Sequence, residues 1–208
     1  MPVLPLILSR AAAVCAAGAA VLAVTSVPAH AESVGVDDPV GDVVNGRFRA
    51  GVPADDFNEE NTDIRRTVLD HRRSVVVTRL RMVDVEASVV PQVTVRLRTP
   101  SGATFSARMA PGTDVRKVVT LTKDVADGEE AARVCDGLRG SLLPEADELV
   151  VAVPRPCLAN PRTIRFGALV RNPIPQTSVN SYDDARLTGG VNPIDYETPI
   201  GRREVRRG

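Results

Sequence analysis

The stretch Gln92-Val93-Thr94-Val95-Arg96-Leu97-Arg98 has the most regular side-chain pattern in the chain. Apolar side chains occupy every second position, and this period of two is typical of a β-strand with one buried face. The turn-forming sequence Thr99-Pro100-Ser101-Gly102 comes next. Residues 103–109 then place a phenylalanine, an alanine and a methionine on one side. Together these segments predict a β-hairpin.

Similar patterns occur on both sides of this hairpin. Residues 63–70 and 74–82 are two β-branched runs separated by a short polar sequence, and they predict a second hairpin. Three further strands are predicted, over residues 114–122, 147–154 and 162–172.

Helical patterns are short in this sequence. Residues 125–133 and 142–149 predict at most one or two helical turns each, and no run carries a sustained apolar i, i+3, i+4, i+7 pattern. Repeated strands with turns between them predict an all-β fold, specifically an antiparallel β-sandwich of the jelly-roll or immunoglobulin-like kind.

The first 31 residues have the composition of an export signal. Arg10 is their only charge, and it precedes an apolar run that is shorter than the roughly 18–20 residues needed to span a bilayer. Ala29 and Ala31 fit the small-residue pattern of a cleavage site. The sequence therefore predicts a signal peptide over residues 1–31, cleavage after Ala31, a secreted protein, and no transmembrane segment after cleavage.

The processed chain, residues 32–208, has the length of a single domain. We expect a β-sandwich over residues 32–187 and an irregular or disordered tail over residues 188–208, where Asn, Pro, Gly and Arg are frequent. Acidic and basic side chains nearly balance, so no global positive field would attract nucleic acid. Nucleic acid is not expected as a partner, whereas an extracellular protein or a glycan is compatible with this composition.

Cys135 and Cys157 are the two cysteines of the processed chain. An even pair in an exported chain predicts a disulfide, which would stabilise the fold by about 3 kcal/mol through loop closure. A metal pair or a redox-active dithiol is the alternative, but the spacing is not C-x-x-C and no histidine cluster lies nearby.

Histidine and aromatic content argue against the common hydrolytic mechanisms. His71 is the only histidine after cleavage, and we expect it to be solvent-exposed in a hairpin turn. A Ser-His-Asp triad would depend on it, and neither a Gly-x-Ser-x-Gly motif nor a glycine-rich phosphate loop is present. Tryptophan is absent, which disfavours sugar-stacking and base-stacking platforms. A non-enzymatic protein without a catalytic residue is therefore expected.

The acidic stretch Asp37-Asp38-Pro39-Val40-Gly41-Asp42-Val43 is the one candidate metal site. Carboxylate oxygens are the ligands that Ca²⁺ prefers, and irregular loops suit its coordination. The candidate ligands are Asp37, Asp38, Asp42 and Asp63. The spacing does not match an EF-hand.

A polar turn is the alternative interpretation of this stretch. Asp-Pro and Gly-Asp favour tight turns, and aspartate side chains there can cap backbone amides. Asp183 and Asp184 would add metal ligands only if the C-terminal region folds back onto the acidic stretch. Both interpretations stay open from the sequence.

The order of the motifs resembles a family of uncharacterised secreted actinobacterial proteins, over residues 37–187. The motifs are DPVGDV, VTVRLRTPSG, VPRPCLANPRTIRFGA and YDDA. The resemblance implies a secreted β-sandwich and transfers no activity. More remotely, the D-P-x-G-D opening followed by hairpins is similar to extracellular sandwiches of the DOMON and carbohydrate-binding kind, which bind haem or sugar.

Three functions are compatible with these features. The leading hypothesis is a secreted, non-enzymatic β-sandwich that acts as a binding or structural module. The second is a sandwich that binds a carbohydrate or another small ligand and is stabilised by calcium. The third is an extracellular hydrolase of unrecognised type.

Overall fold

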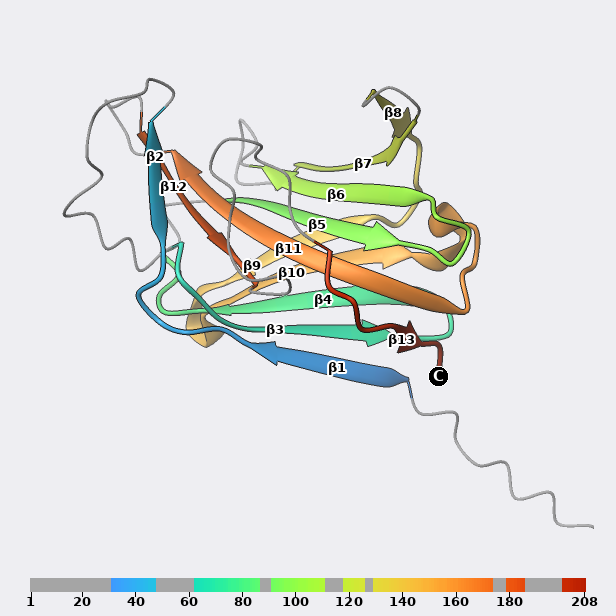
Figure 1. The fold of residues 1–208 in the computed structure, drawn as a ribbon, viewed down its shortest axis with the longest axis horizontal. Helices are drawn as coiled ribbons and strands as arrows, with labels where there is room; N and C mark the ends of the chain where they lie inside the picture. The colour runs from blue at the N-terminus through green and yellow to red at the C-terminus, as the bar shows by residue number, and fades with distance from the viewer. Residues whose placement is uncertain are drawn as a thin grey trace, which may run out of the picture.

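The computed structural model describes residues 31–47, 62–86, 91–110, 118–125, 129–173, 179–185 and 200–208. Within these ranges the chain folds into two antiparallel β-sheets packed face to face, with only two short 3₁₀ helices (Figure 1). The predicted all-β sandwich is confirmed. The proposed signal peptide falls almost entirely outside the described residues.

The smaller sheet has the strand order β1-β3-β4-β10-β9. Its strands are β1 (Glu32–Asp37), β3 (Ile64–His71), β4 (Val75–Met82), β10 (Glu148–Pro154) and β9 (Arg139–Leu143). The larger sheet has the order β2-β12-β11-β5-β6-β7-β8, and β13 also pairs with β11. Its strands are β2 (Val44–Arg47), β12 (Val179–Asp184), β11 (Thr163–Pro173), β5 (Gln92–Arg98), β6 (Thr104–Ala110), β7 (Val118–Asp124), β8 (Glu130–Arg133) and β13 (Val205–Arg206).

The core lies between the two sheets because each central strand turns its apolar face inward. In β5 the inward positions Val93, Val95 and Leu97 are fully buried, as their alternation predicts. Val93 lies directly between Met109 of β6 and Val170 of β11, so one row of buried side chains crosses three strands. Such cross-strand pairs stabilise a sheet and fix its register.

Every strand that the sequence predicts from clear alternation is present. These strands are β3, β4, β5, β6, β7, β10 and β11, although residues 114–117 of the strand predicted over residues 114–122 fall outside the described ranges. Residues 130–133, predicted as part of a helical turn, instead form strand β8. The other predicted helical turn is confirmed as a 3₁₀ helix at Pro144–Ala146.

The C-terminal tail differs from the prediction in its last part. Residues 200–208 pack against the sandwich, where Val205 is fully buried and pairs with Ile164 of β11. The backbone N–H of Gly208 donates to the carbonyl of His71, 3.2 Å away. The prediction of a disordered tail is therefore wrong for this segment, and residues 188–199 lie outside the described ranges.

Five connections between consecutive strands of the described ranges cross from one sheet to the other, and two of them bear on the sites described below. Residues 38–43 lead from β1 of the smaller sheet to β2 of the larger one. Residues 134–138 lead from β8 of the larger sheet to β9 of the smaller one. The second connection is anchored by the predicted disulfide, which joins Cys135 to Cys157 in the 3₁₀ helix Arg155–Leu158.

No helix among the described residues is long and apolar enough to cross a membrane.

Candidate metal centre

Three aspartates from two distant parts of the chain meet at one end of the sandwich. Asp38 and Asp42 lie in the connection between β1 and β2, and Asp183 lies in β12. One carboxylate oxygen from each lies within 4.8 Å of the others. Asp38 and Asp183 are buried, with 8% and 3% of their surface exposed, and Asp42 is half-buried. We call these three residues the aspartate cluster.

The register of the larger sheet places Asp183 in the cluster. Asp183 lies opposite Val170 of β11, whose side chain is part of the core between the sheets. Directly paired residues of an antiparallel ladder share a face, so the Asp183 carboxylate points inward. The backbone N–H of Ile64, at the start of β3, donates to Asp183 Oδ2 at 2.6 Å. This bond ties β12 to the smaller sheet.

A tight turn brings Asp42 back towards Asp38. Gly41 adopts a φ of 87°, in the left-handed region that glycine tolerates best. Its backbone N–H donates to Asp63 Oδ2 at 2.7 Å. Asp63 therefore holds the turn from the start of β3, as the capped-turn interpretation predicts for an aspartate in this region.

The electrostatics of the cluster are unfavourable for three ionised carboxylates. Burial and, to a smaller extent, the nearby charges of Asp38, Asp42 and Asp63 together raise the pKa of Asp183 to about 9, against the opposing hydrogen bond from Ile64. Without a cation, Asp183 is therefore protonated at neutral pH. A bound cation would replace that proton and stabilise all the carboxylates in their charged form.

The cluster fits a hard cation by ligand type and by size. All three ligands are carboxylate oxygens, which suit Ca²⁺ or Mg²⁺ rather than Zn²⁺. Oxygens bound to one Ca²⁺ at 2.3–2.6 Å lie at most about 5 Å apart, whereas Mg²⁺ restricts them to about 4.2 Å. The limit of 4.8 Å between the cluster oxygens is compatible with the larger ion. Backbone carbonyls and water would complete its six to eight ligands.

The structure separates the four aspartates that the sequence suggests as ligands. Asp38 and Asp42 belong to the cluster. Asp37 lies outside it, because its side chain is exposed and pairs with Arg66 at 2.8 Å. Asp63 lies beside the cluster, where its carboxylate accepts the Gly41 N–H.

Asp183 joins the cluster because the C-terminal region does fold back, as β12. The sequence gives this role only as a condition, since the strand is polar and lies between segments rich in Pro and Gly. The sequence feature that points to this role is the pair of adjacent aspartates, Asp183 and Asp184, directly after Tyr182. Acidic side chains on the inward face of a strand are costly to bury, and a bound cation can compensate that cost.

His71 is buried, so its predicted exposure is wrong. It ends β3 rather than lying in the turn, and its ring Nδ1 lies 3.1 Å from the carbonyl oxygen of Val205. Burial lowers the pKa of His71, and the nearby charges of Arg155 and Arg207 lower it further. The C-terminal segment covers the imidazole, which is therefore closed to a substrate.

No protein-family model, curated protein or solved structure matches this chain. The fold and the aspartate cluster define it as an antiparallel β-sandwich with a candidate calcium site, and the resemblance given by its motifs stays a prediction.

Proposed function

We propose that this chain is an exported, non-enzymatic β-sandwich module whose two sheets are held together at one end by calcium. The observation that carries the proposal is the convergence of Asp38, Asp42 and Asp183 inside the fold. The charge of a bound Ca²⁺ would compensate the mutual repulsion of these carboxylates.

The export part of the proposal is supported by the leader pattern and by the disulfide. Disulfides persist in oxidising compartments, and Cys135–Cys157 has a bonded geometry here. Outside the cell, Ca²⁺ is abundant enough to fill sites with dissociation constants of about 10⁻⁴–10⁻³ M. A site with three carboxylates is therefore suited to that setting.

A non-enzymatic role is supported by the positions of the reactive side chains. His71 is sealed beneath the C-terminal segment, and Cys135 and Cys157 are bonded to each other. The aspartate cluster is itself internal, with Asp38 and Asp183 more than nine-tenths buried. A carboxylate pair at that depth stabilises a fold more readily than it reaches a substrate.

Thermal unfolding with and without calcium tests this function. A cation that binds only the folded state stabilises it by about 2.7 kcal/mol at 100 times its dissociation constant. For a chain of this length the melting midpoint should then rise by about 5–10 °C relative to the sample in EDTA.

Asp183→Asn is the decisive variant. It should abolish the calcium-dependent rise yet melt close to the wild type in EDTA at pH 7, because an amide resembles the protonated carboxyl present there. Asp37→Asn is the matched control, since Asp37 is an exposed aspartate outside the cluster, and it should keep the full rise. An unchanged midpoint at 100 times the dissociation constant, about 10–100 mM calcium, or an equal loss in both variants, would contradict the proposed site.

A further inference from the structure

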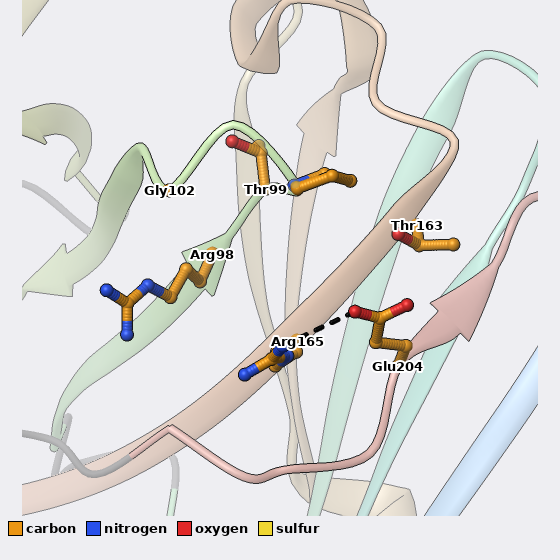
Figure 2. A pocket seen from close by; sticks show the side chains of 7 residues that line it. Arg98, Thr99, Gly102, Thr163, Arg165 and Glu204 are labelled. Carbon is orange, nitrogen blue, oxygen red and sulfur yellow. Dashed lines mark hydrogen bonds and ion pairs between the residues drawn. The ribbon is translucent and has the colours of Figure 1, made fainter.

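A pocket with a volume of about 390 Å³ lies at the other end of the sandwich from the aspartate cluster. It is formed where β5 ends, where β11 begins and where the C-terminal segment passes (Figure 2). Thr163 lines it, whereas Asp183 pairs with Val170, about seven residues and roughly 20 Å further along β11. The pocket is therefore independent of the candidate calcium site.

Two arginines occupy facing positions in this pocket. Arg98 of β5 and Arg165 of β11 are direct partners in the antiparallel ladder, so their side chains leave the same face of the sheet. Both lie on the outer face, since their neighbours Leu97 and Phe166 are buried in the core. Like charges directly opposite each other destabilise a sheet. An anion between them would relieve this repulsion.

The pocket contains less negative charge than these arginines can balance. Glu204 is the only acidic residue in the lining, and its Oε1 lies 3.4 Å from Arg165 in a half-exposed ion pair. The Arg98 guanidinium forms no hydrogen bond or ion pair with the residues that the structure describes. Two positive groups and one negative group leave the lining with one net positive charge.

Neighbouring groups add to the positive potential and supply hydrogen bonds. Arg202, Arg203 and Arg206 are exposed on the C-terminal segment that borders the pocket. The Thr163 hydroxyl lines the cavity, and Gly102 at a φ of 84° keeps a side chain away from its mouth. A positively charged concave surface concentrates anions.

We propose that this pocket binds an oxyanionic group, held between the guanidinium groups of Arg98 and Arg165. Guanidinium groups match carboxylate, phosphate and sulfate by paired, charge-assisted hydrogen bonds. The volume is much larger than one inorganic ion needs and lies in the range of small-molecule pockets. The oxyanion is therefore carried by a sugar-sized molecule, as in a sugar acid, and a free inorganic oxyanion is the other source that the test separates.

Two-dimensional ¹H–¹⁵N NMR spectra of the labelled, purified protein can detect this binding even when it is weak. The probes are glucuronate, inorganic phosphate, inorganic sulfate and neutral glucose. Glucuronate should shift the amides of Gly102 and Thr163 with a dissociation constant in the millimolar range, and glucose should not. Tighter binding of glucuronate identifies a sugar acid as the source, whereas tighter binding of phosphate or sulfate identifies the free ion.

Three variants locate the binding. Arg98→Gln should weaken it at least tenfold, the effect of losing a charge-assisted contact. Glu204→Gln should strengthen it several-fold, because it removes a carboxylate that competes for Arg165. Arg133→Gln is the control, since it removes an equal charge from exposed strand β8, and it should bind as the wild type does.

Absence of shifts with all three anions would overturn the proposal. So would equal binding by the wild type and Arg98→Gln, provided both melt at the same temperature. Asp183→Asn should bind these probes normally, so failure of the calcium site and failure of this pocket are distinguishable.

Discussion

Asp183 and His71 are buried titratable residues in opposite electrostatic surroundings. Asp183 faces other acids, which together with burial raise its pKa to about 9. Burial lowers the pKa of His71 and the nearby charges of Arg155 and Arg207 lower it further, while the hydrogen bond to the Val205 carbonyl and the charge of Glu32 raise it. In both cases the neighbours favour the neutral form. A bound cation would favour the ionised form of Asp183. A second positive charge beside His71 would instead be repelled by Arg155 and Arg207.

His71 should make stability depend on pH just below neutrality. Its pKa in the folded chain lies below the unfolded value of about 6.5, so the unfolded state binds the proton more tightly. The contribution is therefore complete above pH 6.5 and is lost as the pH falls towards the folded pKa. Asp183, whose pKa is raised in the folded chain, acts in the opposite direction over this range, because the folded state there binds a proton that the unfolded state has lost. Denaturant unfolding of the Asp183→Asn variant between pH 7.5 and 5 should therefore show the decrease that His71 causes.

The variant His71→Asn isolates the effect of the histidine. Asparagine can still donate to the Val205 carbonyl but does not titrate. In the Asp183→Asn background, the decrease in the free energy of unfolding between pH 7.5 and 5 should therefore become smaller, whatever the absolute stability. An NMR titration of the imidazole gives the folded pKa directly. A folded pKa at or above 6.5 would show that burial does not lower the pKa of His71.

Strand β13 is the smallest element and seals one edge of the fold. It has two residues, yet Val205 is fully buried and pairs with Ile164. The second residue of β13, Arg206, is exposed, and its backbone N–H donates to the carboxylate of Glu32, the first residue of β1. The segment thus connects β11 of the larger sheet with β1 and β3 of the smaller one.

Val205→Ala should lower the free energy of unfolding by about 2 kcal/mol, because it removes buried apolar surface and leaves a cavity. Arg206→Ala next to it should change stability by less than about 0.5 kcal/mol, since its side chain is exposed. Denaturant unfolding of both variants measures the difference. Equal effects would mean that β13 does not dock in solution.

The elements that sequence patterns predict are those whose burial is local and periodic. In β5 the alternation of apolar and polar residues specifies both the strand and its inward face. In β1 the alternation is limited to Val34 and Val36, and β12 lacks it because it carries Asp183 and Asp184. Their strand structure depends on pairing with β3 and β11, which a local pattern does not encode.

The candidate site was only partly predictable for the same reason. The acidic stretch after β1 is visible in the sequence, and it contains two of the three ligands. Asp38 and Asp183, however, are separated by most of the chain, and only the register of β12 on β11 brings Asp183 inward. The pocket was not predictable, because its charge arises from a cross-strand pairing of Arg98 with Arg165.

At the scale of the whole molecule, the two sheets are fastened at opposite ends. The aspartate cluster joins the connection from β1 to β2 with β12 and the start of β3. The disulfide joins the connection from β8 to β9 with the segment after β10. The β10 segment leads back to the turn between β3 and β4, since the Arg155 N–H donates to the Ser74 carbonyl. β3 thus starts at one fastening and ends near the other.

Removal of the disulfide tests whether these two fastenings act independently. Replacing Cys135 and Cys157 by alanine should lower stability by about 3 kcal/mol, as the chain-entropy model gives for a loop of this length. The melting midpoint should fall by about 6–12 °C. Amide hydrogen exchange should quicken first in β8 and β9, which the bond anchors, and stay slow in the central strands β5 and β11.

Because the sites lie at opposite ends, their contributions should add. The disulfide-free variant should therefore keep the wild-type rise in melting midpoint on calcium addition, measured side by side with the wild type in EDTA. A reduced rise would instead mean that the sheets shift relative to each other when the bond is absent. In that case the aspartate cluster would depend on the packing of the whole sandwich rather than on the register of β12 alone.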